Sequence, residues 1–545
     1  MELEEKMKKF LEKYSSVIII LALMVVTLIY SKLFLPRTGL WFDEMYSVWI
    51  ASHAFPNELL HCIWADDVHA PLYHIFLHFY MKIFGIKDSA IQFSSTIFSL
   101  MLIPIVYKFG KEIFSKKIGL WAATLLTFNA LFIYGTSFVR FYVPASVFFT
   151  LSTFFIFKLM KDNSWKNIIG IAIFNTLLMY TLTTGSMYVF LQGLLFGIYF
   201  LIKRKDLVKP FLIASGIALL LYIPYLPVFI HQYLNVKNSI LGSYSSLFGM
   251  AWTDFLNVFI ALIHKQRMGT TLSPVFRFLI CAVGIIFLIK SFMLKKTEEK
   301  LLFWLFMVIF GFHAMLSILN LAPFNTTYTI SFLGIFALAF ANSFENIKLT
   351  TLKVCILAMM IFPQLNFQNQ NGVLLSEGLV MTFRFGGLIN LMNDLKLDEY
   401  DLLYSPNSSK LIKPFGIKAK SLDICHNAGY LIHNDQRMID LFGKSSLLLK
   451  TSAEKAAFIF HYINYRGVFP ATRNFYEKMM SGTKIGSRII IDLPGHKTTS
   501  IYNKVQLKGS QDMVSLVNHD PRLKIIKQTT VPYTKDLIVI YERIK

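Results

Sequence analysis

The sequence predicts a polytopic α-helical membrane protein with an α/β domain outside the membrane. Hydrophobic residues make up 55% of the 545 positions, and 52 of them are phenylalanine. One soluble core of this length could not bury so much apolar surface. Long apolar runs alternate with short clusters of lysine and arginine up to about residue 365. The remaining chain alternates short apolar strands with helical patterns, which predicts a small α/β domain.

The formal net charge of +22 does not indicate nucleic-acid binding. The basic residues lie in short clusters between apolar runs rather than in one patch, which is the distribution expected from membrane topology. The four cysteines are Cys62, Cys281, Cys355 and Cys425, and none form a CxxC pair. The sequence therefore predicts neither a zinc ribbon nor a disulfide framework.

The apolar runs predict about eleven membrane spans, since a helix needs about 20 apolar residues to cross the hydrocarbon. The run 17–35 is too long for a cleaved signal and has no small-x-small site, so we interpret it as a retained span. The stretch 167–202 contains no Asp, Glu, Lys or Arg and divides into two spans at 183–186. The other nine spans are 17–35, 89–107, 118–135, 141–157, 210–230, 274–289, 301–320, 326–343 and 349–364.

The segment 70–84 decides the predicted topology. It is a short apolar run in which His74, His78 and Lys82 recur at four-residue steps, so these polar groups share one helical face and the segment is predicted to lie in the interface. If it does not cross, every lysine cluster and the lysine-bearing N-terminus fall on one side. We therefore expect a multi-pass protein of the plasma (inner) membrane with a cytoplasmic N-terminus and an extracytoplasmic C-terminus.

Two domains follow from this topology. Residues 1–365 form the transmembrane domain, in which the first external loop, 36–88, carries the interfacial helix. Residues 366–545 form the extracytoplasmic α/β domain. Its predicted strands are 400–404, 457–462, 488–493 and 537–541, with a helical pattern over 388–395.

The first external loop concentrates acidic residues in a strongly basic protein. Between 36 and 69, Arg37 is the only Lys or Arg, and the acids are Asp43, Glu44, Glu58, Asp66 and Asp67. Asp43 and Glu44 follow Trp41 and Phe42 at the end of the first span. Carboxylates near apolar walls are candidate general bases. The alternative is that the pair only favours a helix start.

Three groups of residues in this order resemble the C-type glycosyltransferases (GT-C fold). The likeness is to the branch with protein O-mannosyltransferases, aminoarabinose transferases and Rgt-type galacturonosyltransferases. Asp43-Glu44 matches the branch's acidic pair after the first span. Asp67, His69 and Pro71-Leu72-Tyr73 match its Asp-x-His-Pro-Pro-Leu-Tyr segment, with Ala70 in place of the first proline. Arg140-Phe141-Tyr142 matches an Arg-x-Tyr at the external start of a span, with Phe138 where the branch has Glu.

The resemblance implies a GT-C-like transmembrane catalytic domain that moves a sugar from a polyprenyl-phosphate donor to an envelope lipid, glycan or protein on the outer face, with inversion. Asp43 is the expected base. Glu44, Asp67 and His69 are expected to shape the acceptor pocket, and Arg140 with Tyr142 to bind the donor. A snorkelling Arg140 without a ligand is the alternative. No metal or other cofactor is implied, and the partners are the donor, the acceptor and the bilayer, without nucleic acid.

The sequence departs from the branch at two further places. Thr183-Thr184-Gly185-Ser186 stands where many relatives have Thr-His-Tyr, and Thr327-Tyr328 where they have Arg-Tyr. Lys265 and Arg267 in the long loop 231–271 are reserve candidates for the missing phosphate ligand, although an ordinary solvated loop is the alternative.

Two rival functions remain open from the sequence. A lipid-linked glycan transporter or flippase would place ionisable groups at mid-membrane depth, whereas the predicted spans are nearly free of them. A scaffold whose outer domain binds envelope partners would leave the acidic loop unexplained. A metal site at His74 and His78 lacks the glutamate of an HExxH motif and a third ligand, so interfacial histidines are expected there.

Overall fold

The structure is a computed structural model that divides into two compact units. The first comprises 1–36, 55–233 and 245–379, and the second comprises 37–54, 234–244 and 380–545. The residues described are 2–34, 40, 42–66, 69–238, 259, 262–263, 274–318, 326–365, 394–396, 401–404, 420–422, 473, 476–477, 480–481, 483–493, 511–530 and 537–545.

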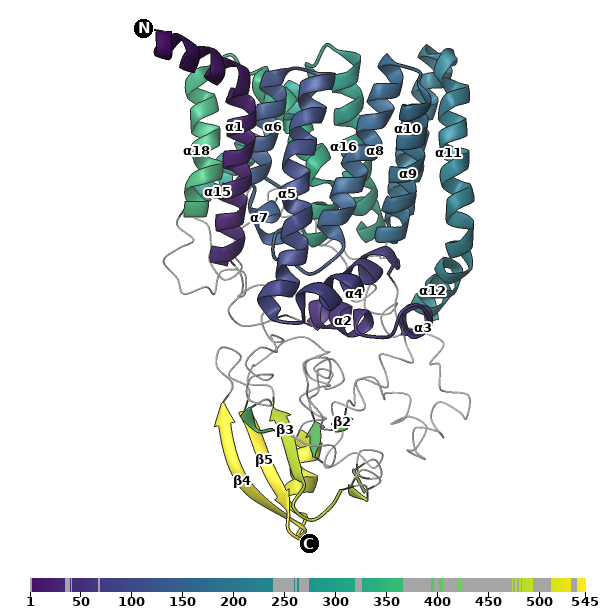
Figure 1. Ribbon diagram of the computed structural model, residues 1–545, viewed down its shortest axis with the longest axis vertical. Coiled ribbons are helices and arrows are strands. Elements are labelled where there is room, and N and C mark those ends of the chain that lie inside the picture. Colours follow the sequence, from purple (N-terminus) through teal and green to yellow (C-terminus); the bar gives the residue numbers. More distant parts are fainter. Residues whose placement is uncertain are drawn as a thin grey trace. The chain divides into compact units, whose positions relative to one another are not determined.

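The long helices of the first unit run alternately up and down as a bundle (Figure 1). The predicted division of 167–202 is confirmed, because α9 ends at Thr181 and α10 begins at Gly185. The helices are α1 (Glu2–Phe34), α3 (Asn57–Asp66), α4 (Leu72–Phe84), α5 (Asp88–Ile113), α6 (Lys116–Thr127), α7 (Ala130–Gly135), α8 (Tyr142–Lys161), α9 (Trp165–Thr181), α10 (Gly185–Lys203), α11 (Val208–Tyr222), α12 (Leu226–Asn238, whose end belongs to the second unit), α15 (Pro274–Phe292), α16 (Thr297–Ile318), α17 (Leu333–Glu345) and α18 (Thr350–Leu365). Short 3-10 turns are η1 (Lys205–Leu207), η2 (Ile223–Tyr225) and η3 (Thr326–Phe332).

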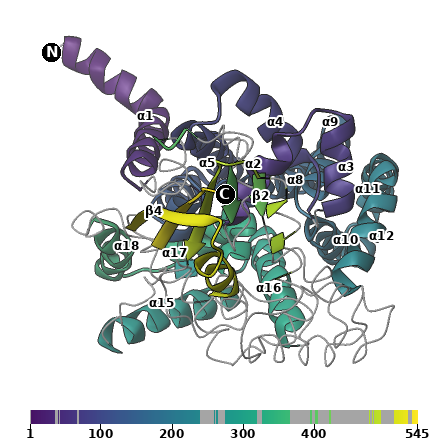
Figure 2. The same cartoon turned by 90° about the horizontal axis from the view of Figure 1, so that it is seen from below.

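Seven described helices are long and apolar enough to cross a membrane, and two shorter apolar helices lie at 278–292 and 350–359. Helices cover all the predicted spans, but α6, α9, α15 and α18 fall outside the seven, so the total of eleven stays a prediction. Within the most apolar windows, 94% of the residues of η3–α17 and 78% of those of α8 are buried, against 33% for α1 and 22% for α11. Accordingly, α1 and α11 lie at the rim in the end-on view of Figure 2.

The basic clusters that follow α5, α8 and α10 lie at one end of the bundle. Lys158 Nζ, at the end of α8, bonds Glu112 Oε2 of α5 at 3.0 Å, and Lys161 Nζ donates to the Glu112 carbonyl at 2.7 Å. Arg204, after α10, donates to the Met160 carbonyl of α8 at 3.2 Å. At the end of α17, Glu345 accepts from Lys353 Nζ at 3.2 Å. The bundle thus has a basic end, and its assignment to the cytoplasm stays a prediction.

Helix α4 lies across the opposite end of the bundle (Figure 1). Its 13 residues span about 20 Å at 1.5 Å per residue, too short to cross the hydrocarbon. The prediction that His74 and His78 lie in the interface was wrong. Both histidines are buried, whereas Phe79, Ile83 and Phe84 of the same helix are exposed. These three exposed apolar side chains therefore point away from the protein, as they do where lipid is the solvent.

Two glycines allow the hairpin between α5 and α6 to close. A Cβ on Gly119 would lie 2.5 Å from the Tyr107 carbonyl oxygen, and one on Gly110 would lie 2.5 Å from the Gly119 Cα. Backbone atoms cannot yield as a flexible side chain can, so Gly119→Ala is expected to lower the free energy of unfolding by about 1–3 kcal/mol. Thermal unfolding of the purified protein in detergent measures this. Gly193→Ala in α10 is the control, since nothing lies within 4 Å of its added Cβ, and an equal loss there would contradict the clash.

The second unit contains helix α2 (Phe42–Ala51) and a five-stranded sheet in the order β2-β1-β3-β5-β4. Strand β1 is parallel to β2 and β3, whereas β5 is antiparallel to β3 and β4. The predicted strands 400–404, 488–493 and 537–541 are confirmed, the strand 457–462 lies outside the described residues, and of the pattern 388–395 only the last two residues are described. The strands are β1 (Leu402–Tyr404), β2 (Lys420–Leu422), β3 (Arg488–Leu493), β4 (Leu523–Thr530) and β5 (Leu537–Arg543).

Ion pairs between buried carboxylates and partly exposed arginines hold the sheet. Arg488, at the start of β3, donates from its backbone N to Asp401 Oδ1 at 2.7 Å and from Nη2 to Oδ2 at 2.6 Å. Asp520, ahead of β4, accepts from Arg522 Nη2 at 2.6 Å and from the Tyr476 hydroxyl at 2.8 Å. Burial raises the pKa of Asp520, but the hydrogen bonds from Arg522 outweigh burial and hold the pKa at about 2. The boundary at residues 365/366 stays a prediction.

This pKa predicts an acid-labile sheet. Because the folded pKa of Asp520 lies below its ordinary value of 3.8, its carboxylate stabilises the fold above about pH 4 and loses that contribution as the pH falls toward 2. Amide hydrogen exchange of 511–530 should be slower in the full-length wild type than in Asp520→Asn at pH 7, with the difference shrinking toward pH 2. Glu477→Gln removes the exposed partner of the same arginine and is expected to have little effect. A pH-independent difference would contradict this role of Asp520.

Candidate functional site

Arg140 is buried in a fixed turn between α7 and α8. Its residue exposure is 3%, although a charged side chain normally needs partners to be buried. Two hydroxyls of α5 hold the turn: Ser95 Oγ donates to the Phe138 carbonyl at 2.6 Å, and Thr96 Oγ1 to the Thr136 carbonyl at 2.7 Å. The turn lies at the end of the bundle opposite the basic clusters. The guanidinium is therefore preorganised where α8 begins.

His69 contacts this guanidinium directly. Arg140 Nη2 lies 3.2 Å from His69 Nε2. Because arginine only donates, Nε2 accepts, and the neutral ring carries its proton on Nδ1. The Phe141 ring backs both groups, 4.7 Å from the His69 ring and 4.6 Å from the guanidinium carbon. Residues 71 positions apart thus form one cationic, aromatic-walled group.

The main chain at His69 is anchored to α12. Gln232 Nε2 donates to the His69 carbonyl at 3.2 Å and to the Ile63 carbonyl at 3.1 Å. The Tyr225 hydroxyl donates to Gln232 Oε1 at 2.8 Å. These bonds fix the chain before α4. The position of His69 therefore depends on Gln232, which lies 163 residues further along the chain on another helix.

Tyr142 extends the aromatic wall. It is buried and lies parallel to Phe138, with ring centroids 5.9 Å apart, and it meets the Tyr328 ring of η3 at 5.8 Å. Phe138, which stands in place of the branch's glutamate, therefore packs instead of binding. The structure brings together His69, Arg140 and Tyr142 of the predicted residues.

Asp43 and Glu44 lie in the first turn of α2, in the second unit. Asp43 is half-buried, Glu44 is 2% exposed, and the Ser47 hydroxyl donates to the Asp43 carbonyl at 3.0 Å. This position agrees with both interpretations of the pair, because a helix N-terminus stabilises carboxylates. Their catalytic role stays a prediction.

The other predicted ligands are not described. Asp67, Lys265 and Arg267 lie outside the described residues. Within the described residues, no three His, Cys, Asp or Glu side chains gather as metal ligands, and the expected lack of a metal stays a prediction. His74 and His78 face the protein rather than the interface, and the His78 ring lies 6.1 Å from Phe55.

Sequence reasoning missed a buried polar cluster. Tyr188 of α10, His313 of α16 and Ser331 of η3 are each 4% exposed or less, and they contact one another inside the bundle. The expectation that the spans are nearly free of ionisable groups passed over His313, the one ionisable side chain between 301 and 316. A lone histidine in an apolar run was the available signal.

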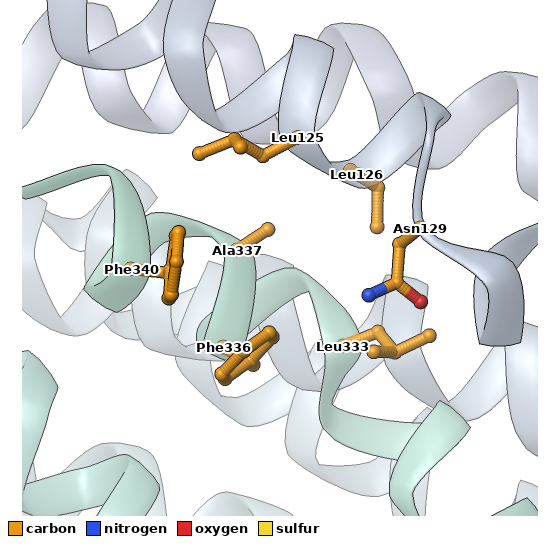
Figure 3. A pocket seen from close by; sticks show the side chains of 7 residues that line it. All are labelled: Leu125, Leu126, Asn129, Leu333, Phe336, Ala337 and Phe340. Carbon is orange, nitrogen blue, oxygen red and sulfur yellow. The ribbon is translucent and has the colours of Figure 1, made fainter. Parts of the chain in front are cut away.

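One small pocket lies between α6 and α17 (Figure 3). Its only polar lining residue is Asn129, whose side chain caps α7 and donates to the Leu262 carbonyl at 2.7 Å. No polar group remains there to orient a ligand. The pocket is lined by Leu125, Leu126, Asn129, Leu333, Phe336, Ala337 and Phe340, none of them a predicted site residue.

Comparisons with known proteins agree with this architecture. Residues 68–231 match the model of the dolichyl-phosphate-mannose-protein mannosyltransferase family. The structure is similar to that of ArnT from Cupriavidus metallidurans bound to undecaprenyl phosphate, with a TM-score of 0.54 and 10% identity over 97% of this chain and 98% of that one. It is also similar to the apo oligosaccharyltransferase of Archaeoglobus fulgidus, with a TM-score of 0.52 and 11% identity over 95% and 80%. No curated protein matched the sequence.

The class of protein follows from these likenesses. The chain is a membrane protein with the GT-C fold of the C-type glycosyltransferases, as its motifs predicted. More particularly, the family match covers His69, Arg140 and Tyr142, the three predicted residues that the structure brings together.

Proposed function

We propose that the protein is a glycosyltransferase that takes a sugar from a polyprenyl-phosphate donor and attaches it to an envelope lipid, glycan or protein on the outer face of the plasma membrane. In this topology the basic end of the bundle and the N-terminus face the cytoplasm, and 366–545 is extracytoplasmic. A fold alone does not determine an activity, so the support for this function comes from the residues of the candidate site.

The observation that carries it is the buried Arg140. A guanidinium held by His69 and Phe141 at the end of the bundle suits a lipid phosphate, whose two unesterified oxygens it can bind through two parallel charge-assisted bonds. The tail of such a lipid would remain among the spans. The structurally similar ArnT was solved with undecaprenyl phosphate, which supports this class of donor.

In the proposed reaction, an acceptor oxygen attacks C1 of the sugar and the bond between C1 and the phosphate oxygen breaks. Asp43 takes the acceptor proton, and the electron pair leaves with the polyprenyl phosphate. Arg140 stabilises the charge that develops there. One displacement inverts C1. Glu44, Asp67 and His69 shape the acceptor pocket, Tyr142 lines the donor site, and Lys265 and Arg267 are reserve phosphate ligands. A monophosphate held by arginine requires no divalent ion.

Reconstitution in liposomes tests the function. The purified protein is given sugar-labelled polyprenyl phosphates, polyprenyl diphosphates and nucleotide sugars, together with lipid, glycan and protein acceptors. We expect transfer from the polyprenyl monophosphates only, with release of equimolar polyprenyl phosphate and an inverted anomeric bond by NMR. Translocation of an intact donor without cleavage would instead indicate a flippase. Transfer from nucleotide sugars would contradict the donor class.

A further inference from the structure

Three polar side chains inside the first unit form a hydrogen-bonded triad. The Tyr188 hydroxyl lies 2.5 Å from His313 Nε2 and 2.8 Å from Ser331 Oγ. Ser331 Oγ in turn donates to the Tyr328 carbonyl at 2.6 Å. The triad joins α10, α16 and η3. Tyr188 is separated from His313 by 125 residues and from Ser331 by 143 residues.

The number of available protons sets the direction of each hydrogen bond in the triad. Ser331 has one hydroxyl proton and gives it to the Tyr328 carbonyl. Tyr188 must then donate to Ser331, and His313 Nε2–H must donate to Tyr188. This direction satisfies all three contacts, whereas the reverse direction leaves the Tyr328 carbonyl without the serine proton. His313 therefore starts a chain of three bonds that ends on the backbone of η3.

The triad reaches the candidate site through a series of ring contacts. The His313 ring lies parallel to that of Tyr328, with centroids 6.0 Å apart and planes at 10°. Tyr328 meets Tyr142 at 5.8 Å, and Tyr142 meets Phe141 at 4.6 Å. Phe141 is the ring that backs the guanidinium of Arg140. Contacts thus run without a break from His313 to Arg140.

In lipid, helices associate through close packing and through hydrogen bonds between them. Polar groups buried among them cost free energy unless they bond one another. A second buried network shows what holding helices together requires. Ser152 Oγ donates to Gln192 Oε1 at 3.0 Å, and Gln192 Nε2 donates to Thr153 Oγ1 at 2.8 Å. That network joins α8 and α10, with Asn175 of α9 beside it, and none of these bonds involves η3.

We propose that the His313–Tyr188–Ser331 triad is a positioning device for the donor site. It fixes η3 so that Tyr328 supports Tyr142 and, through Phe141, the guanidinium that binds the donor phosphate. The effect on catalysis rests on the proposed function, whereas the fixing of η3 does not. His313 acts here as a positioning residue, without contact with the reacting atoms.

The variants separate the hydrogen bond from ring packing. His313→Phe keeps an aromatic ring and removes the donor, and Tyr188→Phe removes the middle hydroxyl. His313→Gln places an amide N–H where Nε2–H stood and is the conservative rescue. Ser152→Ala disrupts the second network and is the matched control, with no residue of the candidate site involved.

Two measurements on the full-length protein decide the inference. Loss of one buried hydrogen bond is worth about tenfold in an equilibrium. Amide exchange of 326–332 should therefore be about tenfold faster in His313→Phe and Tyr188→Phe, and kcat/KM for the lipid donor should fall by a similar factor, mainly through a higher KM. His313→Gln should restore both values. Ser152→Ala should lower the melting temperature and change neither.

The two readouts fail separately. Unchanged exchange of 326–332 in His313→Phe overturns the triad's hold on η3, even if no donor is ever found. Faster exchange with an unchanged donor KM overturns its effect on the donor site. A wild type that uses no polyprenyl-phosphate donor overturns the proposed function, and with it the catalytic half of the inference, while the exchange result still decides the structural half.

Discussion

Replacing Asp43 with asparagine is expected to lower kcat by a factor of about 10²–10⁴, which is what a positioned general base contributes. The amide has the shape of the carboxylate but cannot accept the proton of the acceptor hydroxyl. The KM for the donor should change little, because the proposed phosphate ligand is Arg140 and not Asp43. Steady-state transfer from the labelled donor, measured on folded protein, gives both constants.

Two other acids make this test specific. Glu58→Gln changes an exposed carboxylate in the first turn of α3, in the same acidic loop, and should leave kcat within about twofold, because it is not the proposed base. Glu44→Gln changes the immediate neighbour, which is buried, and should act mainly on the acceptor KM. Wild-type turnover in Asp43→Asn would remove the proposed base, and chemical labelling of Asp43→Cys from the cytoplasmic side would remove it as well.

Composition predicted the fold because lipid imposes a simple rule. A crossing helix must be apolar along its length, so the runs of the sequence correspond to the helices of the bundle. The lysine clusters follow a second rule, that Lys and Arg concentrate in the loops on one side of the membrane, and they lie at one end of the bundle as this rule predicts. Both rules concern one segment at a time, which is why a single sequence suffices for them.

Orientation within the membrane follows no such local rule. In α4, the same periodicity fits either face against the protein, and His74 and His78 turned inward because Phe79, Ile83 and Phe84 satisfy lipid better than imidazoles do. The span 118–135 is likewise divided at Asn129, whose side chain accepts from the backbone N of Leu131 and Phe132. The sequence shows that a residue able to cap a helix lies inside the apolar run, but it does not show whether a helix begins there.

The candidate site was predictable only in part. The motifs around His69 and Arg140 come from a resemblance, and their contact, over 71 residues, is a product of tertiary structure. The bonds of Tyr188 to α16 and η3 span still longer separations, and no periodicity encodes them. Strand β4 also escaped prediction, because its residues from Lys524 to Gln528 are exposed and lack the alternation of a half-buried strand.

Replacing Arg140 with alanine is expected to weaken binding of the lipid phosphate by a factor of about 10²–10⁴. Two charge-assisted hydrogen bonds are lost, each worth about 1.5–3 kcal/mol. Titration with polyprenyl phosphate, the leaving group of the proposed reaction, measures this affinity without turnover. The kcat at saturating donor should fall as well, because the same guanidinium stabilises the departing phosphate.

Arg140→Lys separates charge from geometry. It keeps the positive charge but loses the planar fork that binds phosphate bidentately, so its affinity should lie between those of wild type and Arg140→Ala. Arg204→Ala is the matched control, since Arg204 lies at the basic end of the bundle and pairs with Asp206 at 2.8 Å; its lipid-phosphate affinity should equal that of wild type. Because Arg140 is buried, Arg140→Ala could also unfold the turn, and hydrogen exchange of 136–141 detects that. A folded Arg140→Ala variant that binds polyprenyl phosphate as tightly as wild type would exclude this arginine as the phosphate ligand, since no loss of structure could account for that result.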